Sequence, residues 1–399
     1  MAEATSRIRL RVRMSARPID EPHRVTSPLE LLFDLTFVVA VAAVTAQLAH
    51  QIADGHALEG IVPFLQVFFA IWWAWMNFTW FASSYDTDDV IYRLLTMLQM
   101  AGVLVLGAGV SAAANDSDYR PVALGYLIMR IGLVAQWLRA GVEDKANRRT
   151  ALRYAAGIAI LQVAWILLAL GVMPSSTLLP LFVVLAGLEL AVPRWAERAS
   201  PTNWHPHHIA ERYGLFTIIL LGESVFAATT GVEGALQNAE ISGSFITIAI
   251  ASLILLFALW WLYFLQPAGE ALSDRRHRSY LWGYGHYGIF AALTALGAGL
   301  EVAVEQTGHA LKASPITVGY AVAIPASVFL ALLWAVHAPL VAKPVIPLAM
   351  VLSCVALILL SPLAVGWIGV SGVVAAIATA CALLIAATIT RQATGRLGY

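Results

Sequence analysis

The sequence predicts an all-α integral membrane protein of about 12 transmembrane helices, arranged as two parallel six-helix repeats. Of its 399 residues, 60% are hydrophobic and only 12% are charged, whereas soluble domains carry about 25% charged residues. At about 20 apolar residues per span, this composition provides for about twelve crossings. Long apolar runs and short strings that recur in both halves support the same architecture. An ordinary soluble enzyme is excluded.

The expected spans are apolar runs between charged or Pro/Gly-rich breaks. They are helices, because no alternating strand pattern of a membrane barrel occurs. In the first repeat (29–195) they lie near 31–50, 60–82, 91–112, 121–141, 151–171 and 177–193. In the second repeat (213–390) they lie near 213–231, 243–265, 280–304, 317–337, 344–361 and 367–389. A basic N-terminal tail (1–28), a linker (196–212) and a C-terminal tail (391–399) complete the chain.

The positions of the basic residues predict the orientation. With the N-terminus inside, every Lys and Arg except Arg120, Arg130 and Lys312 lies in a tail, a loop or the end of a span on the cytoplasmic side. We therefore expect both termini in the cytoplasm, and no cleavable signal peptide, because residues 1–28 are polar. The formal net charge of zero gives no indication of a nucleic-acid partner. The expected partners are the lipid bilayer and an ion or small-molecule substrate; the oligomeric state stays open.

Three strings recur in order in the two halves. Phe69-Ala-Ile-Trp-Trp73 returns at 257–261, Leu106-Gly-Ala-Gly109 at 296–299, and Pro121-x-x-x-Gly-Tyr126 at 315–320. Internal duplication is the ground plan of many transporters, and repeats of six helices share one orientation. The alternatives are chance recurrence of abundant residues and close helix packing by small residues.

An ionisable residue inside an expected span is costly and therefore a functional candidate, and we single out Asp34, Arg130 and Glu223. We interpret them as an intramembrane charge relay or substrate path. Arg130 needs a carboxylate partner, and we expect Glu223 to be that partner because the two residues lie at a similar depth. A structural pair that joins the two halves is the competing interpretation.

A second group of polar residues is expected at the cytoplasmic mouth: Glu30, His208, Glu211, Arg212 and His286. Among these, His208, Glu211 and His286 carry side chains that bind zinc or manganese. The His208-x-x-Glu211 spacing is not the two-histidine spacing of zinc proteases, so no metal is assigned. No cofactor motif occurs. The alternative is a helix start with interfacial histidines and a charged first turn.

Asp86, Asp88 and Asp89 follow the second span, and the matching loop after the eighth span is basic. The two loops could form a latch, or the three aspartates a single cation site. The third interpretation is a set of solvated helix ends.

Two segments resemble the hallmarks of the bacterial low temperature requirement A family. They are Pro28-Leu-Glu30-Leu-Leu-Phe-Asp34 with the run that follows, and His208-Ile-Ala-Glu211-Arg212 through Gly222-Glu223-Ser224. The Asp86–Asp89 loop and Tyr284-Gly-His286-Tyr are similar to the same family. The resemblance covers essentially the whole chain and implies a multipass protein of the bacterial inner membrane.

The first span is also similar to the first helix of the endolysosomal potassium channel family, in which the first helix of each six-helix repeat lines the pore. In the Phe-Ser-Asp-Gly signature of that family, the serine is replaced here by Phe33 and the glycine by Leu35, while the aspartate is kept as Asp34. The leading hypothesis is therefore translocation of an ion or small solute, with proton coupling. A membrane-embedded enzyme that uses His208, Glu211 and His286, and a scaffold or lipid-interacting protein, are the alternatives.

Overall fold

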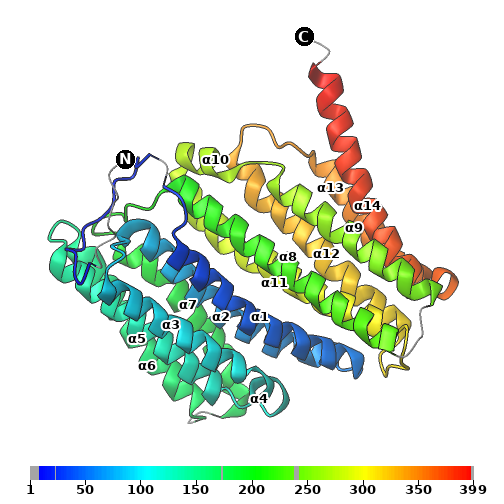
Figure 1. Cartoon of the computed structure of the whole chain (residues 1–399), viewed down its shortest axis with the longest axis horizontal. Helices are drawn as coiled ribbons and strands as arrows, with labels where there is room; N and C mark the ends of the chain where they lie inside the picture. Colours follow the sequence, from blue (N-terminus) through cyan, green and yellow to red (C-terminus); the bar gives the residue numbers. More distant parts are fainter. Residues whose placement is uncertain (1–8, 23, 172–173, 238–241, 397–399) are drawn as a thin grey trace, which may run out of the picture. The chain divides into compact units, whose positions relative to one another are not determined.

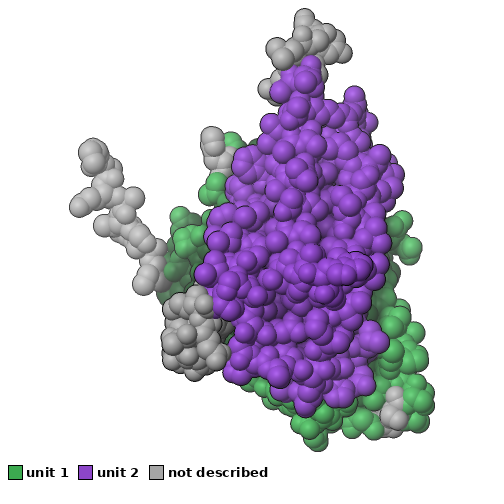
Figure 2. Space-filling view, turned by 90° about the vertical axis from the view of Figure 1, so that its right-hand side faces the viewer, with its two compact units in different colours: residues 1–43, 66–212 green, residues 44–65, 213–399 purple. Residues whose placement is uncertain are grey.

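The computed structural model describes residues 9–22, 24–171, 174–237 and 242–396 (Figure 1). Every regular element in these ranges is a helix and none is a strand, so the predicted all-α class is confirmed. The chain divides into two compact units, which Figure 2 distinguishes by colour. Unit 1 comprises residues 1–43 and 66–212, and unit 2 comprises residues 44–65 and 213–399.

Three helices contribute residues to both units: α1 (Pro28–Ala53), α2 (Ala57–Tyr85) and α8 (Pro206–Gln237). The other helices of unit 1 are α3 (Val90–Ala108), α4 (Val110–Asn115), α5 (Arg120–Glu143), α6 (Arg148–Ala169) and α7 (Ser175–Ala196). In this unit α5 packs against α3 and α6, and α6 packs against α7 (Figure 1).

Helices α3 and α5 approach each other at glycines. A Cβ atom added at Gly125 would lie 2.3 Å from the backbone nitrogen of Leu106 and 2.6 Å from the carbonyl oxygen of Gly102. Because both of these atoms belong to the backbone of α3, no rotamer change could make room. Small residues thus permit the contact, as they do in many membrane helix pairs.

Unit 2 contains α9 (Gly243–Phe264), α10 (Ala268–Asp274), α11 (Ser279–Glu305), α12 (Pro315–His337), α13 (Leu348–Leu360) and α14 (Val365–Arg396). Short 3₁₀ turns lie at Arg276–Arg278, Ala338–Leu340 and Ser361–Ala364. Helix α12 packs against α11, α13 and α14, and α9 packs against α14. Helix α14 bends at Gly369, whose φ of 68° lies in the left-handed region that glycine tolerates.

Ten stretches of the described helices are long and apolar enough to cross a membrane. Each of the twelve expected spans overlaps a helix of the structure, but the ten candidate stretches do not match the twelve spans one to one. The stretch Leu348–Thr394 contains two expected spans, and α8, where the seventh is expected, is not among the ten. The chain is a multipass membrane protein, and the count of twelve stays a prediction.

Candidate functional site

Helix α1 begins with a capping box, a reciprocal pair of hydrogen bonds at its first turn. The Ser27 hydroxyl accepts the backbone N–H of Glu30 at 3.3 Å, and the Glu30 carboxylate accepts the backbone N–H of Ser27 at 2.8 Å. This arrangement satisfies two backbone donors that the helix start would otherwise leave unpaired. It also fixes the carboxylate of Glu30 inside unit 1, where the residue is 0% exposed.

Glu30 and Asp34 lie four positions apart on α1. They face His208 and Arg212, which lie four positions apart in the first turns of α8. The Arg212 guanidinium donates to Asp34 through Nη2 at 2.6 Å and through Nε at 2.9 Å. Its Nη1 lies 3.0 Å from Glu30, as does Nε2 of His208. A two-pronged arginine–carboxylate contact of this kind is among the strongest polar contacts in proteins.

We define the buried charge cluster as Arg24, Glu30, Asp34, His208 and Arg212. Arg24 comes from the N-terminal tail, and Trp75 of α2 borders the cluster. The Trp75 indole donates to Asp34 at 2.7 Å, and the Arg24 guanidinium lies 3.3 Å from Glu30. The two arginines and two carboxylates of the cluster cancel each other's charge when His208 is neutral. Nε2 of His208 faces Glu30, but neither ring nitrogen has a hydrogen-bond partner in the described part of the chain.

Asp86 lies beside this cluster, between α2 and α3. Its carboxylate is 3.5 Å from Arg24 and 3.3 Å from Arg17. Burial and the nearby negative charge of Glu30 raise the pKa of Asp86 to about 6, although the two arginines act in the opposite direction. Asp86 therefore titrates within the range of pH in which the protein can be studied.

The three aspartates after α2 have separate roles. Asp88 forms an exposed ion pair with Arg93 at 2.7 Å. Asp89 caps α3 by accepting the N–H of Tyr92, and it also accepts from Arg139 of α5. Burial of Asp89 raises its pKa, but these hydrogen bonds outweigh burial and lower the pKa to about 2.

The N-terminal tail packs on unit 1 through backbone hydrogen bonds to carboxylates. The N–H of Val12 donates to Asp89 at 2.7 Å, and the N–H of Met14 donates to Glu143 at 2.6 Å. The side chain of Met14 is 0% exposed. The described part of the tail, residues 9–22 and 24–28, therefore belongs to the folded unit, and Arg24 lies at the charge cluster.

Arg130 of α5 has a buried carboxylate partner in Glu189 of α7, at 3.3 Å. The expectation that Glu223 is this partner is therefore corrected. Trp73 and Trp165 donate to Glu189 at 2.8 and 3.1 Å, and the Tyr126 hydroxyl contacts both Glu189 and Arg130. Glu189 lies in an expected apolar span, where an ionisable residue is costly and therefore a functional candidate. It could have been named from the sequence for the same reason as Arg130.

Glu223 lies on the part of α8 that belongs to unit 2, where it is half-buried. In the described part of this unit, the carboxylate of Glu301 on α11 is close enough to Glu223 for the two to repel each other.

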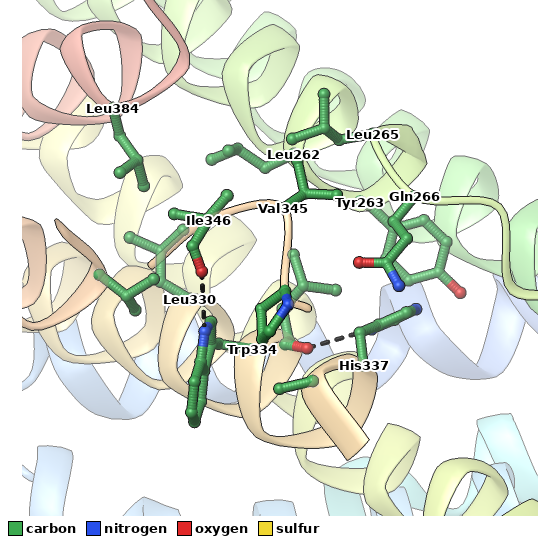
Figure 3. A pocket seen from close by; sticks show the side chains of 14 residues that line it. Leu262, Tyr263, Leu265, Gln266, Leu330, Trp334, His337, Val345, Ile346 and Leu384 are labelled. Carbon is green, nitrogen blue, oxygen red and sulfur yellow. Dashed lines mark hydrogen bonds between the residues drawn. The ribbon is translucent and has the colours of Figure 1, made fainter. Parts of the chain in front are cut away.

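His286 of α11 takes part in a separate polar contact in unit 2. Its Nδ1 lies 2.7 Å from the carbonyl oxygen of Trp282, so this nitrogen carries the proton of the neutral ring. Nε2 then accepts from the Tyr263 hydroxyl at 3.1 Å. Nearby, His337 points toward a cavity of about 50 Å³ that Tyr263 and Trp334 also line (Figure 3).

The three weak metal candidates do not form a common set of ligands in the part of the chain that the structure describes. There, no group of three or more His, Cys, Asp or Glu residues could hold a metal ion. His208 is fully buried against Glu30, whereas Glu211 is exposed and accepts the backbone N–H of Thr26 at 3.2 Å.

Comparison with known proteins identifies the family. The family model described as "Bacterial low temperature requirement A protein" matches residues 25–388, which extend from the buried charge cluster to α14. A protein of Rhizobium meliloti (strain 1021), described as uncharacterized, is 29% identical over 294 residues, which make up 69% of each chain. The segments that contain Glu30, Asp34, His208 and Arg212 thus lie inside the matched range. The chain belongs to the bacterial low temperature requirement A family.

Proposed function

We propose that this protein translocates an ion or small solute across the bacterial inner membrane, with both termini in the cytoplasm and with coupling to protons. The buried charge cluster is the observation that carries the proposal. Replacing a buried ion pair by apolar residues is often neutral or stabilising, so stability alone does not explain five ionisable side chains at one place. Ionisable residues within membrane helices commonly line substrate paths and proton relays.

The charge of this cluster depends on one titratable ring. With neutral His208 the cluster has no net charge, and a proton bound to the His208 ring would give it a charge of +1. The added charge would strengthen the attraction of His208 to Glu30, in competition with Arg212, which shares the same carboxylate. Protonation would thereby bias the contact between α1 and α8 within unit 1. A two-state element biased by a proton is the requirement for coupling.

We infer that the path continues through the other ionisable residues of the helices. In unit 1 this path would include Asp34, Arg130 and Glu189, and in unit 2 it would include Glu223. Glu30, His208, Glu211 and Arg212 would lie at the cytoplasmic mouth in unit 1, and His286 would do so in unit 2.

We also propose twelve spans in a 6+6 repeat. The stretch Leu348–Thr394 has 47 residues, room for two spans of about 20 residues each, and α8 adds a further helix of 32 residues. The recurring strings in the two halves support the duplication.

The test is flux through purified protein in proteoliposomes, with a pH-sensitive dye inside and K⁺, Na⁺ or H⁺ gradients imposed in turn. Glu223→Gln and Asp34→Asn are expected to abolish flux. Glu59→Gln, on a side chain that is 77% exposed, is the matched control and is expected to retain it. Absence of flux from correctly folded wild-type protein, or full flux through both variants, would contradict the proposal.

A further inference from the structure

Unit 1 contains a cavity of about 140 Å³ between α2, α5, α6 and α7. Aromatic rings form a continuous wall on one side of it. The ring centroids of Phe69 and Phe182 are 5.8 Å apart, those of Phe182 and Trp165 are 5.2 Å apart, and those of Trp165 and Tyr126 are 6.4 Å apart. All three contacts are edge-to-face, the arrangement that aromatic pairs favour. The wall therefore offers both ring faces and ring edges to an occupant.

The lining of this cavity carries no formal charge. Trp165 and Tyr126 direct their polar groups to Glu189, whose charge is balanced by Arg130. An ion that entered would lose its hydration and meet no counter-charge on the wall, which is costly. The chemistry of the wall thus selects an uncharged molecule.

One polar pair lies on the same lining. The Tyr119 hydroxyl donates to the Gln66 side-chain oxygen at 2.7 Å. This bond uses the hydroxyl proton of Tyr119 and leaves its oxygen able to accept, while the Gln66 amide nitrogen remains able to donate. A single hydroxyl group on the occupant can pair with either atom.

We propose that this cavity is a binding site for a small uncharged aromatic alcohol of the phenol class. Its volume is close to that of an engineered cavity of about 150 Å³ in another protein, which binds benzene. The aromatic wall matches the ring, and the Gln66–Tyr119 pair matches the hydroxyl. The proposal goes beyond translocation, because binding at this site requires no movement across the membrane.

The experiment is a titration of 4-fluorophenol into the full-length protein in lipid nanodiscs, followed by ¹⁹F NMR, with empty nanodiscs subtracted. Saturable binding is expected. Ala123→Phe places a ring inside the cavity from α5 and is expected to weaken binding at least tenfold. Leu124→Phe is the matched control, because Leu124 is the next residue of α5, is 52% exposed and does not line the cavity.

Ala70→Phe fills the same cavity from α2 and keeps the test decisive if Ala123→Phe does not fold. Unsubstituted phenol is expected to displace the probe, whereas hexan-1-ol is not. Equal displacement by hexan-1-ol would mean that the cavity holds a lipid-like chain, and would overturn the proposal. Binding without saturation, or binding that both cavity-filling variants retain, would also overturn it.

Discussion

The contact between Arg212 and the two carboxylates of α1 predicts a large and specific coupling energy. Arg212→Met removes two contacts to Asp34, at 2.6 and 2.9 Å, and one to Glu30 at 3.0 Å. All three side chains are at most 1% exposed, so the substitution leaves two buried negative charges without their main counter-charge. Breaking one partner of such a pair costs about 3–5 kcal/mol.

Asp34→Asn is expected to cost about 3 kcal/mol, because hydrogen bonds to charged groups contribute about 1.5–3 kcal/mol each. In the double variant each substitution removes the other's partner, so the loss is expected to be about 2 kcal/mol or more below the sum of the single losses. The free energies of unfolding are to be measured in bicelles by titration with SDS, followed by circular dichroism.

The exposed pair of Arg93 and Asp88 provides the control cycle, because its two side chains are 53% and 51% exposed. Its coupling energy is expected to be about 0.2–1 kcal/mol. A coupling energy between Arg212 and Asp34 as small as that of the exposed pair would refute the reasoning that burial makes this contact strong.

Three further outcomes are expected. Because the pKa of Asp86 is raised, its contribution to stability is fully present below about pH 4 and is lost as the pH rises through about 6. Asp86→Asn is therefore expected to reduce the fall in Tm between pH 4.5 and 7.5. An unchanged slope of Tm against pH would contradict the raised pKa. Met14→Ala should lower the free energy of unfolding by about 2–5 kcal/mol in the same SDS titration, because its side chain is fully buried; a loss below about 0.5 kcal/mol would mean that the tail does not pack. Gly125→Ala should lower Tm through its clash with the backbone of Leu106, whereas Gly187→Ala, which meets no atom within 4 Å, should not; equal effects would contradict the close approach.

Much of the architecture could be predicted from local signals. Apolar runs gave the positions of the helices, because a span must satisfy its backbone internally and be apolar over its whole length. The spacing of four between Glu30 and Asp34 placed both on one face of α1, as the structure has them. These inferences needed only the helical period and the cost of burying charge.

The partners of the charged residues could not be predicted in the same way. Which helix supplies the carboxylate for Arg130 depends on the packing of α5, α6 and α7, and sequence depth alone could not choose between Glu223 and Glu189. Arg24 lies in a polar segment without periodicity, which reads as a solvated tail. Its burial depends on acceptors such as Asp86 that are distant in the sequence.

The buried charge cluster also has a consequence for biosynthesis. Asp34 and Arg212 are separated by 178 residues, so at about 5–20 residues per second the ribosome adds Arg212 about 10–35 seconds after Asp34. Throughout that interval Asp34, in the second turn of α1, lacks the arginine that pairs with it in the folded protein, whereas Arg24 of the N-terminal tail is already available to Glu30. We therefore expect the first turns of α1 to stay near the lipid headgroups until α8 has been made.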